Sequence, residues 1–255
     1  DIFNPFSLIN ALDDRELRNY WASSGATSLL PKFVDDMEMK MEYFDHCFIE
    51  RDTLETSDVV NGGAELFLYQ SGYLTIKGYD DGVYILGFPN FEVRKALYRV
   101  VVPALTMKSN SEVVSAQSFL RKMMQDGNTA EAKKALKALI ADVPYSNKKM
   151  ASMDMEERYR LIMSTIFRAL GFRVEVERML ATGRIDMIVE VPSFIYVLEL
   201  KLSNNGGISA AENQMKEKSY TEPFKADKRK VIALAVELDE TGKGLIDWKE
   251  VDESL

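Results

Sequence analysis

The most informative segment in the C-terminal part of this chain runs from Gly183 to Leu202, GRIDMIVEVPSFIYVLELKL. Two runs rich in β-branched and aromatic residues, 185–191 and 194–202, flank a short break at Pro192–Ser193. Runs of this kind are typical of strands, whereas Pro and Ser are typical of turns. The pattern therefore predicts a β-hairpin.

Three charged residues, Asp186, Glu199 and Lys201, lie inside these otherwise apolar runs. A buried and unpaired charge costs several kcal/mol, so each of them needs a partner, a metal ion or access to water. Because side chains alternate along a strand, Glu199 and Lys201 share one face with Val197. The hairpin is therefore predicted to carry a charged cluster on one face.

The register of the hairpin decides which of these charges meet. If Pro192–Ser193 is a two-residue loop, Asp186 lies directly opposite Glu199. If the loop is instead Ser193–Phe194, Asp186 lies opposite Lys201. In either register the three side chains share a face, with cross-strand Cβ atoms roughly 5 Å apart.

Two carboxylates at this spacing repel each other unless a hard divalent cation lies between them, and Mg²⁺ and Mn²⁺ prefer oxygen ligands. A neighbouring ammonium group can orient or deprotonate a water molecule, or stabilise a developing negative charge. The cluster therefore indicates metal-assisted phosphodiester hydrolysis. A purely structural ion-pair network is the alternative interpretation.

Asp186 followed by Glu199-Leu200-Lys201 resembles the PD-(D/E)XK nuclease superfamily, whose signature is an Asp, a spacer and then (D/E)-x-K on the next strand. Ile185 stands where the signature has Pro. The resemblance implies an enzyme, a Mg²⁺-dependent nuclease. It makes Asp186 and Glu199 metal ligands and Lys201 the residue that positions or activates the water.

The same resemblance points to two further site residues. Glu156 matches a family glutamate near the start of the preceding helix and is a candidate metal ligand; a solvated acid that complements the helix dipole is the alternative. Gln214 and Tyr220 match a Gln-x5-Tyr spacing seen in related nucleases. Gln214 is therefore a candidate catalytic residue that contacts the attacking water or the substrate phosphate, or else an exposed polar residue, whereas Tyr220 is expected in the core.

Other polar residues are weaker candidates for a role in the site. Glu177 lies where the family often has Glu, although acids at strand edges are common. Arg184 is expected in a surface ion pair, with a phosphate contact as the alternative. His46 and Cys47 are expected to be structural, because a zinc site needs about four ligands and the sequence has one His and one Cys.

Periodicity around the hairpin predicts a restriction-endonuclease-like domain over residues 150–255. Asp154 and Glu157 form a predicted capping box at the start of its first helix, which Gly171 ends. The remaining expected elements are a strand at 172–177, the hairpin, a helix at 208–220, a buried strand at 231–236 and an edge strand at 245–251. The order of the core is therefore αβββαβ, to which the edge strand at 245–251 is added.

The preceding residues predict two further parts. Residues 1–107 are expected to form a helical and winged-helix-like region, with helices from Pro5, at 64–70 and at 91–102, and a hairpin of 72–79 with 83–88. Residues 108–149 are expected to form a helical hairpin broken at 126–128, followed by a linker at Pro144–Lys149. The predicted fold class is therefore α+β with an α/β nuclease-like domain at the C-terminal end.

The segments NPFSLINAL, RNYWASSGATSLL, LYQSGYLTIKGYD and ILGFPNFEVRKAL are similar to the middle of bacterial AAA-ATPase-like proteins that end in a PD-(D/E)XK nuclease domain. This resemblance implies an upstream ATPase domain that is missing from this chain. The sequence has no GxxxxGK[ST] motif and does not begin with Met. We therefore expect a fragment that does not bind ATP by itself.

Composition and charge bear on the cellular location of the protein and on its binding partners. The 255 residues contain one Cys, no apolar run of membrane-spanning length and no signal-peptide pattern, so we expect a cytoplasmic protein without a disulfide and without a membrane partner. The net charge of −8 counts against tight autonomous DNA binding. The local basic candidate is the group Lys225, Lys228, Arg229 and Lys230, for which a solvated charged segment is an equally good interpretation.

These observations predict metal-dependent hydrolysis of DNA, with Mg²⁺ or Mn²⁺ as cofactor and coupling to the upstream ATPase in the parent protein. RNA is an alternative substrate, and a homo-oligomer is compatible with the sequence. The rival hypothesis is a catalytically silent nuclease fold that serves as a binding or assembly module, with its acidic surface facing another protein.

Overall fold

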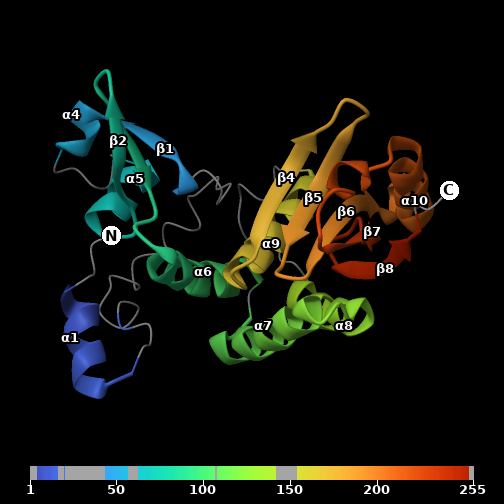
Figure 1. Ribbon diagram of the computed structural model, residues 1–255, viewed down its shortest axis with the longest axis horizontal. Coiled ribbons are helices and arrows are strands. Elements are labelled where there is room, and N and C mark those ends of the chain that lie inside the picture. Colours follow the sequence, from blue (N-terminus) through green and yellow to red (C-terminus); the bar gives the residue numbers. More distant parts are fainter. Residues whose placement is uncertain are drawn as a thin grey trace. The chain divides into compact units, whose positions relative to one another are not determined.

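The computed structural model describes residues 5–16, 20, 44–56, 63–106, 108–141 and 154–252 (Figure 1). The chain divides into two compact units, Asp1–Val101 and Val102–Leu255. The predicted linker at Pro144–Lys149 lies outside the described residues, as does all of the segment 18–30 except Tyr20.

The first unit contains a small antiparallel sheet with the strand order β1-β3-β2. Asp81 and Gly82, the two residues between β2 and β3, both have positive φ angles, of 40° and 85°, as the tight hairpin turn requires. The predicted hairpin and its flanking helices are therefore present, whereas β1 and α4 had not been predicted. The elements are α1 (Pro5–Asp14), β1 (Cys47–Glu50), α4 (Arg51–Leu54), α5 (Gly63–Gln70), β2 (Thr75–Asp80), β3 (Val83–Gly87) and α6 (Phe91–Thr106), which runs past the boundary between the units.

The second unit contains a five-stranded sheet with the order β4-β5-β6-β7-β8, in which β6 and β7 are parallel and the other pairs antiparallel. From α9 onward the elements follow the predicted order αβββαβ, and β8 lies at the edge of the sheet, as predicted. The elements are α7 (Asn110–Gln125), α8 (Thr129–Ile140), α9 (Met155–Ala169), β4 (Arg173–Met179), β5 (Arg184–Glu190), β6 (Phe194–Leu202), α10 (Gly207–Lys218), β7 (Lys230–Leu238) and β8 (Leu245–Val251).

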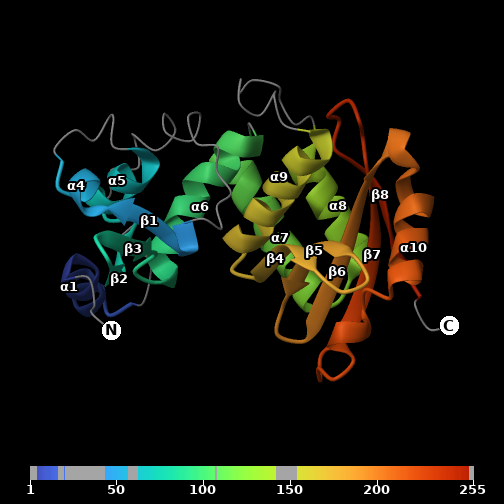
Figure 2. The same cartoon turned by 90° about the horizontal axis from the view of Figure 1, so that it is seen from above.

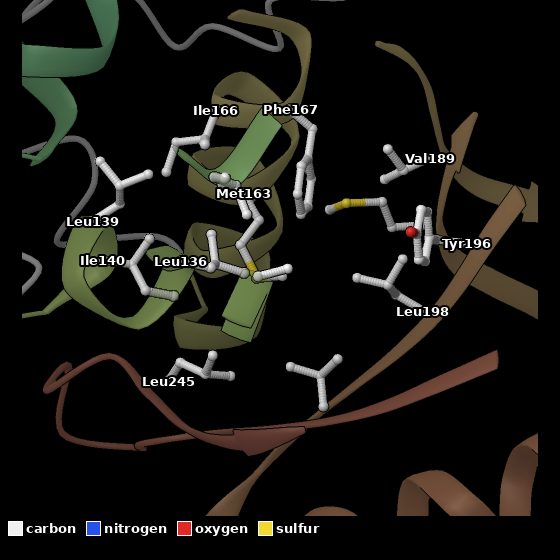
Figure 3. Packing of buried hydrophobic residues seen from close by; sticks show 14 of the residues in the cluster. Leu136, Leu139, Ile140, Met163, Ile166, Phe167, Val189, Tyr196, Leu198 and Leu245 are labelled. Carbon is white, nitrogen blue, oxygen red and sulfur yellow. The ribbon is translucent and has the colours of Figure 1, made fainter. Parts of the chain in front are cut away.

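Helices cover both faces of this sheet: α7, α8 and α9 lie on one side and α10 on the other (Figure 2). Alternate residues of β6 divide between the two cores, with Tyr196 and Leu198 facing α9 and Ile195 and Val197 facing α10. The larger core packs Leu136, Leu139 and Ile140 of α8 and Met163, Ile166 and Phe167 of α9 against Val189, Tyr196, Leu198 and Leu245 (Figure 3). Within the described residues, no helix has both the length and the apolar character needed to cross a membrane.

The predicted capping box at the start of α9 is wrong. Asp154 does precede the helix, but its side chain makes no capping hydrogen bond. The first turn instead begins with the Arg158 backbone N–H donating to the Asp154 carbonyl at 3.0 Å. Glu156 and Glu157 both lie in this first turn, where a negative charge complements the helix dipole. A complete capping box occurs at α7, between Ser109 and Glu112.

Candidate active site

The β5–β6 hairpin has the register that a two-residue loop at Pro192–Ser193 requires. The Val191 N–H donates to the Phe194 carbonyl at 3.0 Å, and the paired residues run from Glu190–Ile195 to Met187–Leu198. The next pair in this register is Asp186 and Glu199. The first of the two predicted registers is therefore confirmed.

The sheet is irregular at Asp186. The regular β5–β6 pairing ends at Met187, the residue that follows Asp186 in the sequence. The residue opposite Asp186 on β4 is Glu177, which has a φ of +53° within the strand. Ile185 and Ile188, three residues apart, both pack in the core beneath α10, so the simple alternation of side chains is interrupted between them. Non-glycine residues in the left-handed region are uncommon and gather at functional sites.

The Asp186 carboxylate is buried, with 4% of the residue exposed, and donors reach both of its oxygens. Oδ2 accepts a hydrogen bond from the Leu200 backbone N–H at 2.9 Å, which fixes the carboxylate against β6. Oδ1 lies 3.4 Å from Nη2 of Arg160. Asp186 is thus held between β6 and α9, next to Glu199 in the register.

Glu199 and Lys201 form a direct pair: Lys201 Nζ donates to Glu199 Oε1 at 2.7 Å. The other oxygen of Glu199, Oε2, is buried and has no hydrogen-bond partner among the described residues. Burial, and then the negative charge of Asp186, raise the pKa of Glu199 to about 8. A buried carboxyl oxygen without a partner is costly. The raised pKa lets a proton satisfy it in the metal-free protein, and a bound divalent cation would take the place of that proton.

Lys201 is held as an ammonium ion. Burial acts to lower its pKa, but the hydrogen bond to Glu199 and the charges of Glu199, Asp186 and Glu156 outweigh burial and raise the pKa. Lys201 therefore has protons to donate and is poorly suited to remove one. This environment favours orienting water or stabilising negative charge over general-base catalysis.

Arg160 of α9 connects three acids of the site, and the sequence interpretation missed it. Its Nη1 lies 3.0 Å from Glu177 Oε1, and its Nη2 lies 3.2 Å from Glu156 Oε1 and 3.4 Å from Asp186 Oδ1. One signal was available: Glu156 and Arg160 are four residues apart on a helix, a spacing that favours ion pairs. The contacts to Glu177 and Asp186 require the tertiary fold.

Glu156, the third predicted metal ligand, lies at the edge of this cluster. Burial and the charge of Asp186 raise the pKa of its carboxyl group, while Lys201 and Arg160 act in the opposite direction. Its ion pair is with Arg160. Glu156 therefore belongs electrostatically to the same site as Asp186 and Lys201.

Gln214 and Tyr220 form a hydrogen-bonded chain beside the site. Gln214 Nε2 donates to Tyr220 Oη at 3.0 Å, and Tyr220 Oη donates to the Arg184 carbonyl at 2.8 Å. Tyr220 is buried in the core beneath α10, as predicted. The Arg184 guanidinium lies 3.0 Å from Glu177 Oε1 and forms the expected ion pair at the surface.

The remaining candidates lie elsewhere. Lys230 pairs with Phe194 in the sheet, five residues from Glu199 along β6, so the basic segment is roughly 17 Å from the charged cluster. Arg229 of that segment forms ion pairs with Glu190 and Asp227. In the first unit, the His46 ring packs edge-on against Phe48, and Cys47 is a buried free thiol.

The chemistry of the donors fits a hard divalent cation. Within the described ranges, no three Asp, Glu, His or Cys side chains are arranged to hold a metal ion. Asp186 and Glu199 nevertheless supply two adjacent carboxylates, one with a buried unpaired oxygen. Mg²⁺ is commonly bound by one or two carboxylates, with water and substrate phosphate as its other ligands. These two residues would hold such an ion.

The comparison with protein families agrees with the fold of the second unit. Residues 154–248 match the family model described as the PD-(D/E)XK nuclease superfamily, and we identify a domain of this superfamily there. Members of the superfamily are generally nucleases, which suggests phosphodiester hydrolysis and nucleic acid as the substrate class.

A curated relative is the "Uncharacterized protein in vnfD 5'region" of Azotobacter chroococcum mcd 1, which is 25% identical over 268 aligned positions. The match covers 100% of this chain and 50% of the relative, so the chain spans about half the length of that protein. No solved structure gives a significant match to the chain.

Proposed function

We propose that the second unit hydrolyses phosphodiester bonds of DNA with the help of Mg²⁺ or Mn²⁺. Asp186 and Glu199 would hold the cation, and Lys201 would act beside it. The observation that carries this proposal is the buried Oε2 of Glu199, which has no partner among the described residues and belongs to a carboxylate adjacent to Asp186. A divalent cation bound here would satisfy this oxygen and would stabilise both carboxyl groups in their charged form.

Each residue then has a distinct part. A divalent cation held here supplies positive charge against the phosphate and makes a water molecule more acidic. The Leu200 N–H donates to Asp186 and thereby orients the carboxylate that would bind the cation. Lys201, kept positively charged by Glu199, donates hydrogen bonds that orient the water or stabilise the developing charge on the phosphate.

Gln214 and Glu156 are proposed to support this centre. The Gln214 amide holds Tyr220, which in turn holds the backbone of Arg184, two residues before Asp186. This chain of contacts favours a positioning role for Gln214 over a direct contact to water. Glu156 contributes negative charge near Asp186 and is the additional carboxylate available to the cation.

The charge distribution bears on where DNA would bind. Residues 1–101 hold 9 Lys and Arg against 17 Asp and Glu, whereas residues 102–255 hold 23 of each. The whole net charge of −8 therefore belongs to the first unit, and the second unit is neutral. Phosphate repels acidic surfaces, so we assign DNA contact to the second unit, with RNA as the alternative substrate.

The part played by the first unit is a separate proposal. Its chain order β1-α4-α5-β2-β3 and its sheet order β1-β3-β2 support a winged-helix-like module. Its acidic character favours contact with protein, and in the parent protein that contact would couple the nuclease to an upstream ATPase domain. Self-association into a homo-oligomer is an alternative use of this unit.

The test is cleavage of labelled single- and double-stranded DNA with Mg²⁺ or Mn²⁺. Asp186→Ala and Lys201→Ala are each expected to reduce the rate about 100-fold or more, because each removes a group that contacts the reacting centre. Lys249→Ala is a matched control: Lys249 is exposed, pairs with Glu212 on α10, and lies on the edge strand. This variant should cleave at the wild-type rate.

Cleavage that persists in both site variants would refute the assignment of the centre. A folded protein that binds metal but does not cleave any substrate, with or without its ATPase, would support the catalytically silent binding module instead.

A further inference from the structure

Arg160 occupies a position that the proposed chemistry does not explain. It is a buried arginine, with 9% of the residue exposed, and it enters the charged cluster from α9 rather than from the hairpin. Its guanidinium contacts Glu156, Glu177 and Asp186, while its Nε has no hydrogen-bond partner among the described residues. The guanidinium therefore partly neutralises the charge of three carboxylates, although one of its N–H groups makes no hydrogen bond within the part of the chain that the structure describes.

The acids around Arg160 are numerous enough to need this balance. Glu156, Glu177, Asp186 and Glu199 bring four carboxyl groups together through a continuous set of contacts. Lys201 pairs with Glu199, and Arg184 pairs with Glu177 at the exposed side. Among the described residues, Arg160 is the cation in direct ion pairs with both Glu156 and Asp186.

We infer that Arg160 is a positioning residue that serves as the internal counter-cation of the metal centre. It holds Glu156 and Asp186 in place when no divalent ion is bound, and its positive charge opposes the binding of that ion. This inference rests on the proposed function, because it takes Asp186 and Glu199 as the metal ligands.

The opposition follows from distance and charge. A cation bound at Asp186 brings two positive charges within a few ångströms of the guanidinium, which lies 3.4 Å from Asp186 Oδ1. Like charges at this separation in a partly buried site repel strongly, and water screens them poorly. Arg160 thus stabilises the metal-free protein and weakens the metal-bound one. A residue with a merely structural role would stabilise both forms equally.

The experiment measures Mn²⁺ binding by calorimetry, and thermal unfolding in chelator and in saturating Mn²⁺, on the full chain. Arg160→Gln removes the charge, and we expect it to tighten Mn²⁺ binding on the order of tenfold. Its Tm in chelator should fall below that of the wild type, and Mn²⁺ should raise its Tm by more than it raises the wild-type Tm. If Arg160→Gln is unfolded in chelator, Mn²⁺ should restore folding.

Two matched variants separate charge from shape and from position. Arg160→Lys keeps the charge but loses the planar fork, so its Mn²⁺ affinity should stay within about threefold of the wild type while its Tm in chelator falls. Arg184→Gln removes a charge that contacts Glu177 from the exposed side, and it should also leave the Mn²⁺ affinity within about threefold. Asp186→Asn should abolish binding.

The outcomes distinguish this inference from the proposed function. If the wild type binds Mn²⁺, Asp186→Asn does not, and Arg160→Gln binds no more tightly than the wild type, the inference is overturned and the metal centre stands. Failure of Arg160→Gln to fold in saturating Mn²⁺ would also overturn it. If the wild type does not bind Mn²⁺, or if Asp186→Asn binds as well as the wild type, the metal centre and the inference fail together.

Discussion

The thiol of Cys47 is fully buried in the small sheet of the first unit. Burial, and then the negative charge of Glu65, raise its pKa from 9.0 to about 12. Below pH 9 the folded and unfolded states both keep the thiol proton. Between pH 9 and pH 12 the unfolded state releases it and the folded state does not, so stability is lost as the pH rises through this range.

We therefore predict that the Tm of the first unit falls between pH 8 and pH 10.5, and that it falls less in Cys47→Ala. Tyr73, whose pKa burial also raises to about 12, keeps its own contribution in that variant. Calorimetric scans at the two pH values measure the difference. An identical fall in both proteins would show that the thiol does not titrate as its burial requires.

At the scale of single residues, the sequence predicted Asp186, Glu199 and Lys201 because each is a charge inside an apolar run. It did not predict the role of Arg160, because an arginine on a helix four residues after a glutamate is ordinary. The difference is that a two-residue loop narrows the hairpin to two registers, and in both of them the three charges share a face. The approach of α9 to Asp186 depends on packing between elements far apart in the sequence.

The turn between α7 and α8 attaches the helical hairpin to the sheet. Gly127, in this turn, has a φ of +73°, and a Cβ added to it would lie 2.5 Å from Cζ of Phe194 at the start of β6. Tyr196 Oη donates to the Met124 carbonyl at 2.6 Å, and Trp248 Nε1 donates to the Thr129 carbonyl at 3.0 Å. The turn is therefore packed directly against β6 and β8.

We predict that Gly127→Ala lowers the free energy of unfolding by about 2–3 kcal/mol, of which about 1 kcal/mol comes from the positive φ and the rest from the clash with the ring. Urea denaturation measures the loss. In a Phe194→Leu background the same substitution should cost less, because the ring atom it meets is gone. Equal losses in the two backgrounds would exclude the clash.

At the scale of elements, local chemistry predicted both hairpins, the strands other than β1 and the break at 126–128. It left two registers open for the β5–β6 hairpin. The capping box at Asp154 was predicted from residue spacing alone, and spacing does not fix the side-chain rotamers that a capping hydrogen bond needs. Strand β1 was not predicted because its four residues carry too little pattern to be separated from the surrounding loop. Its pairing with β3 is a long-range contact.

Two units with separate hydrophobic residues at their centres should unfold separately. The first unit buries Leu66, Phe67 and Leu86, whereas the second buries the residues that pack α8 and α9 on the sheet. We predict two calorimetric transitions, of which only one rises when Mn²⁺ is added, because a ligand stabilises the unit that binds it. Chelator should reverse the shift. A single transition, or an equal rise in both, would contradict this view of the molecule.

Asp186 and Glu199 are proposed to hold a divalent cation together, beside Lys201. Crystals of the full chain grown with Mn²⁺ test this claim most directly through the anomalous scattering of the metal. We predict a Mn²⁺ ion within about 2.2 Å of carboxylate oxygens from both residues, and its loss in Asp186→Asn. A Mn²⁺ ion bound elsewhere, or an Asp186 side chain turned away from Glu199, would contradict the claim.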